Sequence, residues 1–405
     1  MDQERIDDVL VVGGGIIGLS IAREAALLGL RVRLLERGKI GGEASGAAAG
    51  LLSPQAEADR AGPLFTLGLV SRDLFPEFAA GVEEESGLDP ALWRRGTLVA
   101  ARSGRETEEL DRRFAFQRAL GLPAERIGGE ALRRMEPALH PDWCEALYLP
   151  RDLSVDNVVL VEGLRLSAKR LGVRLQEEAR ADRLLVEDGR VVGVGIGGGR
   201  ARAGAVVIAA GAWSAEIAGI DPPLPLRPVR GQIVCLGPAA APVFPIFGPD
   251  CYLVPRRDGR VLAGSTMEEA GFDKSVTGAA LRDLSAGALA LVPGLATAPF
   301  HSAWAGLRPA LPDGLPAIGR AAPGLLHACG HLRNGILLAP VTARLVARLL
   351  ADQDPGMDLS PFDPGRFQNW NGGAVDAEVP GPVSGPAGPS PSRGCASRAR
   401  RGSPS

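Results

Sequence analysis

Residues 9–36 read VLVVGGGIIGLSIAREAALLGLRVRLLE, and this stretch decides how the rest of the chain is interpreted. Residues 9–12 are β-branched and aliphatic throughout, as expected of a parallel strand buried on both faces. A glycine turn follows, then a segment with apolar residues at helical spacing, and residues 31–35 return to a strand pattern. The order of strand, turn, helix and strand predicts the first unit of a Rossmann-like domain.

The glycines of the turn and the acid that closes the stretch predict a dinucleotide site. Gly13 allows a tight turn, Gly15 lets a pyrophosphate approach the backbone, and Gly18 lets the helix pack closely on the strand. The helix N-terminus presents free N–H groups to the phosphates. Glu36 can accept hydrogen bonds from ribose hydroxyls, which favours a free 2′-hydroxyl over a 2′-phosphate. A purely structural glycine turn is the alternative, but strand, helix and acid are all in register here.

Small residues dominate the segment directly after this unit, which reads GGEASGAAAG at residues 41–50. Small side chains let the backbone and another body approach closely. A loose linker is the alternative, but Leu51 and Leu52 continue the segment into an apolar stretch. We therefore expect a second contact with the cofactor in this segment.

The composition is that of a globular protein and excludes several classes of partner. The chain has 405 residues, 45% of them hydrophobic, and a formal net charge of −2. This near balance implies no nucleic-acid partner, and no apolar run is long enough for stable membrane insertion. The acidic N-terminus leads directly into the first strand, so no secretory signal is expected. The five cysteines lack metal-ligand spacing and there are only four histidines, so we expect a reduced, cytoplasmic protein without a metal site.

The expected fold class is α/β, with a Rossmann-like cofactor-binding domain and a second α+β substrate domain built on an antiparallel sheet. The chain leaves the first domain and returns to it, because residues 205–211, AVVIAAG, form another buried strand pattern that ends in a glycine. The assignment is residues 1–85, 150–225 and 320–352 for the cofactor domain, and residues 86–149 and 226–319 for the substrate domain.

The C-terminal part carries three further expectations. The last helix is expected to open at Pro340, since proline is favoured in a first helical turn. The last ordered part is expected to end at residue 350. Residues 371–405 are dominated by proline, glycine and serine and are expected to form a disordered tail.

Three features favour a flavin over a nicotinamide cofactor. The glycine fingerprint is followed directly by the small-residue segment, and the later AAG strand returns to the same domain. Residues 330–340, GHLRNGILLAP, form the third feature, a glycine turn that leads into a helix. The positive end of that helix dipole could stabilise charge near N1 and the C2 carbonyl of a flavin.

These residues also carry a family resemblance. The N-terminal fingerprint with SGAAAGLL at residues 45–52, AWAGLRPALPDGLPAIG at residues 303–319, and GHLRNGILLAP at residues 330–340 resemble the D-amino-acid oxidase superfamily of FAD enzymes. The last two phrases are specific, whereas the first is shared by many flavoproteins. The resemblance covers residues 7 to about 350, and it is strongest to the glycine-oxidase branch that serves the thiazole of thiamine.

The resemblance implies a set of residues around FAD and a substrate. The cofactor-binding residues would be Gly13, Gly15, Ile16, Ile17, Gly18, Glu36, Arg37, Ala44, Ser45, Ala49, Gly50, Leu51, Ala181, Gly211, Gly330, His331, Leu332, Arg333, Asn334, Gly335, Ile336 and Leu337. Arg308 would bind the substrate carboxylate through a bidentate fork. Arg333 and Tyr252 would lie at the same site, and Met267 would limit its size.

The residues themselves make the Arg308 assignment sensible. Arg308 lies in an otherwise apolar stretch, so its charge needs a partner, either a substrate carboxylate or an internal Asp or Glu. Tyr252, one of only two tyrosines, is either a site residue or an ordinary packed one. His331 is expected to be a wall residue rather than a base. Hydride transfer from an amino-acid Cα to a flavin needs only the deprotonated amine, the held carboxylate and an aligned Cα–H.

The resemblance implies oxidation of glycine and other small amines, such as sarcosine and small D-amino acids, with oxygen reduced to hydrogen peroxide. The imine would be hydrolysed to the oxo acid and ammonia or passed to thiazole synthesis, which makes thiazole synthase a candidate partner. A homo-oligomer, tetramer or dimer, is expected. Three alternatives stay open: a D-amino-acid dehydrogenase that passes electrons to a quinone, a sarcosine-oxidase-like enzyme, and a flavin-binding scaffold without turnover.

The cysteines predict non-covalent FAD. Sarcosine-oxidase-like enzymes usually tether FAD through a cysteine near the end of the substrate domain, and residues 303–319 contain no cysteine. Cys329 precedes the GHLRNG turn and is expected to be a buried thiol.

Overall fold

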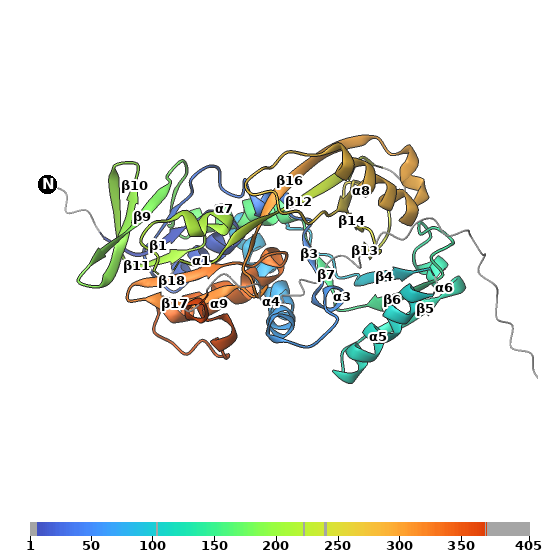
Figure 1. The fold of residues 1–405 in the computed structure, drawn as a ribbon, viewed down its shortest axis with the longest axis horizontal. Helices are drawn as coiled ribbons and strands as arrows, with labels where there is room; N and C mark the ends of the chain where they lie inside the picture. Colours follow the sequence, from blue (N-terminus) through green and yellow to red (C-terminus); the bar gives the residue numbers. More distant parts are fainter. Residues whose placement is uncertain (1–5, 103, 222, 239–240, 369, 371–405) are drawn as a thin grey trace, which may run out of the picture.

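The structure, a computed structural model, describes residues 6–370 except residues 103, 222, 239–240 and 369. Two large sheets occupy opposite halves of an elongated molecule, with helices packed around them (Figure 1). The expected α/β class with a Rossmann-like domain is confirmed. The expected disordered tail, residues 371–405, lies outside the described residues.

The first large sheet is mostly parallel. Its strands are β1 Asp7–Val12, β2 Val32–Leu35, β8 Arg174–Gln176, β9 Ala181–Glu187, β10 Arg190–Ile196, β11 Gly199–Ile208, β17 Ala317–Ala322 and β18 Leu325–Cys329. The central order is β17-β18-β11-β1-β2-β8, and only β17 pairs antiparallel with its neighbour. β9 and β10 form a hairpin that pairs with β11. The carboxyl ends of β1 and β2 therefore lie side by side, which places the glycine turn next to Glu36.

The second large sheet is almost entirely antiparallel. Its strands are β4 Thr97–Ala101, β5 Glu125–Gly128, β6 Glu145–Leu149, β12 Arg227–Leu236, β13 Ile246–Phe247, β14 Tyr252–Pro255, β15 Val261–Gly264 and β16 Phe300–Ala310. The order is β16-β12-β15-β14-β13-β4-β6-β5, with one parallel pair between β13 and β4. A separate two-stranded sheet joins β3 Leu51–Leu52 to β7 Leu153–Ser154.

The helices are α1 Ile16–Leu27, α2 Ala44–Ala47, α3 Pro54–Glu57, α4 Pro63–Ser86, α5 Arg105–Ala119, α6 Gly129–Met135, α7 Asn157–Arg170, α8 Gly278–Leu291 and α9 Gly335–Leu350. α1 and α9 contact strands of the first sheet, whereas α5, α6 and α8 contact strands of the second. α1 packs against α7 and α9, and α4 packs against the same two helices. Ile21, Phe75 and Val346, from three of these helices, are fully buried in one apolar cluster. No described helix has both the length and the apolar character needed to cross a membrane.

The expected start of the last helix at Pro340 is wrong. α9 begins at Gly335, and Pro340 lies inside it. A proline within a helix removes one N–H donor and crowds the preceding turn. The Ser71 hydroxyl of α4 lies at this point, donating to the carbonyl of Leu337 at 2.6 Å and accepting from the N–H of Val341 at 3.3 Å. Because this hydroxyl satisfies groups beside the proline, the helix can continue through it.

Ser71→Ala is expected to lower the free energy of unfolding by about 1–3 kcal/mol, since it leaves buried backbone groups beside Pro340 without this partner. Urea unfolding measures the loss. Ser20→Ala is the matched control, because Ser20 is also fully buried in a helix but its hydroxyl has no partner among the described residues. Equal losses in the two variants would show that the Ser71 hydroxyl does not support the helix.

The expected end of the ordered part at residue 350 is also wrong. Two 3₁₀ turns follow α9, η3 Ser360–Phe362 and η4 Pro364–Phe367. Phe362 is 1% exposed and joins the core of the first sheet. Phe367 packs with Leu224 and Cys329 in a smaller apolar cluster. Two aromatic side chains are enough to order this short segment, although it has no regular apolar periodicity.

Candidate cofactor and substrate site

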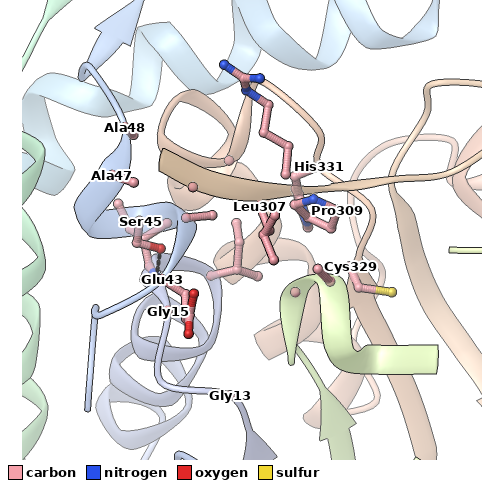
Figure 2. Close-up of a pocket in the computed structure, with 18 of the residues that line it drawn as sticks. Gly13, Gly15, Glu43, Ser45, Ala47, Ala48, Leu307, Pro309, Cys329 and His331 are labelled. Carbon is pink, nitrogen blue, oxygen red and sulfur yellow. Dashed lines mark hydrogen bonds between the residues drawn. The ribbon is translucent and has the colours of Figure 1, made fainter. Parts of the chain in front are cut away.

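A cavity is lined by residues from both large sheets and from the segments that join them. The glycine turn and the small-residue segment form one side, and the end of β16 and the turn before α9 form the other. Figure 2 shows this division, with Gly13, Gly15 and Ser45 on one side and Leu307 and His331 on the other. Residues far apart in sequence therefore share one site.

The glycine turn has the geometry that close approach requires. Gly13 has a φ of +115°, and a Cβ on it would lie 2.3 Å from the carbonyl oxygen of Ala209. A Cβ on Gly18 would lie 1.9 Å from the carbonyl oxygen of Gly13, so only glycine lets α1 pack this closely on β1. The N–H of Ile16, in the first turn of α1, donates to Ser45 Oγ at 2.9 Å. The small-residue segment is thus tied to the start of α1.

Glu36 is held at the end of β2 by two backbone groups. Its carboxylate accepts from the N–H of Gly14 at 2.7 Å and from the N–H of Gly38 at 2.8 Å. The residue is 8% exposed and lines the cavity. Arg37 follows it and lies 3.5 Å over the ring of Trp213. A buried acid fixed by the backbone at this point fits the ribose-binding role that its position predicts.

The small-residue segment forms a wall of the cavity and not a loose linker. Part of it folds into α2, and its backbone approaches β16 closely. A Cβ on Gly306 of β16 would lie 2.6 Å from the Cβ of Ala47. Trp304, also on β16, donates from Nε1 to the carbonyl of Ala47 at 3.0 Å. These contacts explain why the segment needs small side chains.

Arg308 lies at the other end of the cavity, on β16. Its guanidinium donates to the carbonyl of Thr266 at 2.9 Å and to Ser265 Oγ at 2.7 Å. Burial lowers the pKa of this guanidinium from its usual value, because the surrounding protein disfavours a charge. Within the described part of the chain it forms no ion pair with an Asp or Glu. The described residues therefore provide no internal Asp or Glu partner for Arg308, which was the alternative to a substrate carboxylate.

A glycine on the neighbouring strand makes room for this arginine. Gly231 of β12 pairs with Gly306 of β16, and a Cβ on Gly231 would lie 2.2 Å from the guanidinium carbon of Arg308. The guanidinium thus lies directly against the backbone of β12. Gly264 does the same for Tyr252, since a Cβ there would lie 2.6 Å from the tyrosine hydroxyl. Gly231 and Gly264 thus leave the space that the side chains of Arg308 and Tyr252 occupy.

Tyr252, Arg333 and Glu57 line the same cavity as Arg308. Arg333 lies 3.5 Å from the Glu57 carboxylate and contacts the Met267 sulfur at 3.9 Å. Glu57 ends α3, a short helix whose backbone is held by the buried carboxylate of Asp152. The predicted substrate residues therefore gather in one place, although Met267 reaches it through Arg333 and is not itself part of the cavity lining.

His331 has the properties of a wall residue. It is 4% exposed, and burial lowers its pKa to about 3, so the ring is neutral at physiological pH. One ring nitrogen, Nε2, lies 3.1 Å from the Thr342 hydroxyl. Cys329, on the same wall, is 1% exposed, and burial raises the pKa of its thiol to about 12. Neither residue is poised for acid–base or nucleophilic chemistry.

Most of the predicted site residues line the cavity, and a few do not. Those outside its lining are Gly18, Met267, Gly330, Asn334 and Leu337. Gly18 and Gly330 instead allow close packing. A Cβ on Gly18 would lie 1.9 Å from the carbonyl oxygen of Gly13, and a Cβ on Gly330 would lie 2.4 Å from the Leu311 side chain. The described residues contain no cluster of His, Cys, Asp and Glu that could hold a metal ion.

Sequence reasoning missed several lining residues, namely Glu57, Trp213, Gly231, Ser265 and Gly306. The two glycines carried a usable signal, since a glycine inside a strand pattern often marks a close approach of other groups. The other three residues carried none, because their place at the site depends on how the segments pack.

Comparison with known proteins places this site in a family. Residues 8–349 match the DAO family model, described as FAD dependent oxidoreductase. The glycine oxidase of Pseudomonas aeruginosa is 38% identical over 364 residues, which cover 88% of this chain and 98% of that protein. The crystal structure of glycine oxidase from Geobacillus kaustophilus has a TM-score of 0.84 and 36% identity, and the match covers 89% of this chain and 98% of that one.

A third relative is longer than this chain. The bifunctional protein ThiO/ThiG of Nostoc sp. is 37% identical over 368 residues, which cover 89% of this chain and 55% of that protein. The chain thus spans about half the length of the bifunctional relatives it matches. The family match over most of the chain and the glycine turn, Glu36 and Arg308 around one cavity agree with each other. This chain belongs to the DAO family of FAD dependent oxidoreductases.

Proposed function

We propose that this chain is a glycine oxidase, which oxidises glycine and other small amines to the imine while oxygen is reduced to hydrogen peroxide. The observation that carries the proposal is the half-buried guanidinium of Arg308, which has no Asp or Glu partner among the described residues and lines the same cavity as the glycine turn. A small substrate carboxylate supplies the missing charge. Relatives named glycine oxidase support the choice of amine.

The residues present fit FAD. Gly13 and Gly15 of the glycine turn line the cavity, as do Ile16 and Ile17 at the start of α1, and a helix N-terminus favours a phosphate nearby. Glu36 fits a ribose, and Ala44, Ser45 and residues 47–51 of the small-residue segment line the cavity. When bound, FAD supplies the hydride acceptor for the substrate Cα–H.

The chain's own residues bind and orient the substrate. Arg308 holds the carboxylate by a forked pair of N–H donors, and Ser265 and the carbonyl of Thr266 fix the plane of that fork. Tyr252 lies beside the same end of the cavity, packed against Gly264. His331 has a pKa lowered to about 3 by burial and lies against Thr342, so it acts as a wall residue and not as a base for the substrate amine. Orientation, and not acid–base chemistry, is what these residues contribute.

The division into domains is part of the proposal. FAD would lie in residues 1–85, 150–225 and 320–352, and the substrate would be held by residues 86–149 and 226–319. Relatives that carry the name ThiO/ThiG support a place in the thiazole branch of thiamine biosynthesis and thiazole synthase as a partner. Cytoplasmic localisation and a tetramer or dimer complete the proposal.

FAD is expected to be bound without a covalent bond. Cys329 is the cysteine that lines the cavity, and its raised pKa leaves little of the thiolate that attachment would need. Acid precipitation of the purified protein should release the yellow colour into the supernatant. Colour that stays in the protein pellet would show a covalent link instead.

Oxygen uptake with glycine, sarcosine and D-alanine tests the proposed reaction. The proposal expects oxygen consumption and hydrogen peroxide with all three amines, and ammonia from glycine. Bleaching of the flavin by an amine without oxygen consumption would favour a dehydrogenase that uses a quinone. This outcome is tested because the chain is also similar to a solved structure of an L-proline dehydrogenase, with 25% identity and a TM-score of 0.80. No reaction with any amine would favour a scaffold without turnover.

A further inference from the structure

A segment of the substrate sheet reaches across to the nucleotide side of the cavity. It comprises residues 268–277, which connect β15 to α8, and we refer to it as the clasp. Its middle touches two residues that line the cavity, Trp213 through Phe272 and Glu43 through Lys274, and both of these in turn contact Arg37. The clasp therefore joins the two halves of the molecule at a point away from Arg308.

The base of the clasp is anchored by one buried arginine. Arg230 of β12 is 7% exposed and pairs with Glu268 at 2.5 Å and with Asp273 at 2.6 Å. It also donates to the carbonyl of Ser275 at 3.3 Å. Gln232, two residues further on, bonds Glu268 and the N–H of Thr277. Both ends of the clasp and Asp273 in its middle are thus held by β12.

The tip of the clasp makes one aromatic and one ionic contact across the cavity edge. The rings of Phe272 and Trp213 are 5.4 Å apart, and Arg37 lies on Trp213 at 3.5 Å. Lys274 Nζ lies 3.0 Å from the Glu43 carboxylate, which also pairs with Arg37 at 3.0 Å. Phe272, Trp213, Arg37, Glu43 and Lys274 thus form one connected set of contacts, which we call the cap.

This cap lies at the adenosine end of the cavity. Arg37 directly follows Glu36, the acid at the end of β2, where a Rossmann-like domain holds a ribose. Glu43 immediately precedes α2, whose Ser45 is bonded to the first turn of α1. Arg308 and Tyr252, by contrast, lie on strands of the substrate sheet. A ligand that leaves from the adenosine end must pass the groups that the clasp covers.

We propose that residues 268–277 retain FAD, with Phe272 and Lys274 closing the adenosine end of the site. This assigns a cofactor-retaining role to residues of the substrate sheet. It rests on the FAD dependence of the family and not on the proposed substrate. For the cofactor to leave, Phe272 must lift from Trp213 and Lys274 must part from Glu43.

The contacts are suited to a closure that can open. Phe272 is 44% exposed, and the Lys274 side chain is also 44% exposed, so neither gives up much burial when the tip moves. Exposed ion pairs are weak and are screened by salt. The anchor at Arg230 is buried and holds Glu268 and Asp273, so opening requires only that the side chains of Phe272 and Lys274 move.

The test measures how fast FAD leaves. Holoenzyme is diluted and the rise in flavin fluorescence is followed for the wild type, Phe272→Ala and Lys274→Ala. Each variant should release FAD about two- to tenfold faster, the range expected from losing one exposed aromatic or ionic contact. Raising the ionic strength from about 0.05 to about 0.5 M should speed release from the wild type more than from Lys274→Ala.

Two matched controls separate retention from general damage. Phe300→Ala removes another exposed phenylalanine, and Lys39→Ala removes another exposed lysine that pairs with Glu177, both outside the clasp. These should release FAD at the wild-type rate. Thermal melting should show a lower Tm for the clasp variants with FAD and an unchanged Tm without it. Release rates equal to the controls, or an equal fall in Tm of the FAD-free proteins, would overturn the proposal.

Discussion

Replacing Arg308 by alanine is expected to raise the KM for glycine at least about 100-fold while FAD stays bound. Removing one partner of a buried, hydrogen-bonded charge pair costs 2–5 kcal/mol or more, and about 1.4 kcal/mol corresponds to a factor of ten. The arginine contacts Ser265 and Thr266, none of which belongs to the glycine turn, so the cofactor should be unaffected. Steady-state kinetics and the flavin absorbance of the purified variant give the two readouts.

Two further variants sharpen this result. Arg308→Lys keeps the charge but loses the fork, so it should recover only part of the affinity for glycine. Arg320→Ala is the control, because Arg320 is an exposed arginine of β17 that pairs with Asp352. Loss of FAD from Arg308→Ala, or full activity in it, would mean that this residue does not bind the substrate carboxylate.

Gly18→Ala is expected to damage the cofactor site more than any other single methyl group. The added Cβ would lie 1.9 Å from the carbonyl oxygen of Gly13, so α1 must move away from β1. Overpacking of this kind costs about 3 kcal/mol. The movement also displaces the first turn of α1 from the phosphates, so FAD affinity should fall more than about tenfold. Equilibrium unfolding and flavin titration of the FAD-free protein measure the two effects.

Gly278→Ala is the matched control for this variant. Gly278 is the first residue of α8, and a Cβ there would meet no heavy atom within 4 Å. Alanine also has the higher helix propensity, so stability should stay the same or rise slightly. If Gly18→Ala behaved like Gly278→Ala, the close packing of α1 on β1 would not be needed for the site.

Much of the nucleotide side could be predicted from the sequence because its signals are local. The strand pattern, the glycine spacing and the acid after β2 all fall within 28 residues, and together they favour one interpretation, a dinucleotide site. Two further strand patterns, at residues 97–101 and 181–187, predict short strands whose bounds match β4 and β9. The small-residue segment was expected to contact the cofactor rather than to form a loose linker, and it lines the cavity.

The errors come from tertiary contacts that no local pattern contains. Pro340 was expected to start a helix, and the hydroxyl of Ser71, 269 residues earlier, lets the helix run through it. The sequence does not predict the short strands β5, β6 and β13. They are stabilised by pairing within the second sheet and not by a strand pattern of their own. Gly231 makes room for Arg308, but only the register of β12 against β16 brings the two together.

The substrate end was predicted from resemblance more than from the residues. Arg308 alone left two partners open, a substrate or an internal acid, and sequence gave no way to choose. Burial of the guanidinium and the neutral hydrogen-bond partners around it favour the substrate. Glu57 was missed because it reaches the site through α3, whose position depends on the distant carboxylate of Asp152.

Anaerobic mixing of the FAD-bound protein with glycine tests the central claim most directly. The account predicts that glycine bleaches the visible flavin absorbance, that Arg308→Ala requires far more glycine for the same change, and that admitting oxygen restores the colour with formation of hydrogen peroxide. An unchanged flavin spectrum with glycine, sarcosine and D-alanine alike would contradict it.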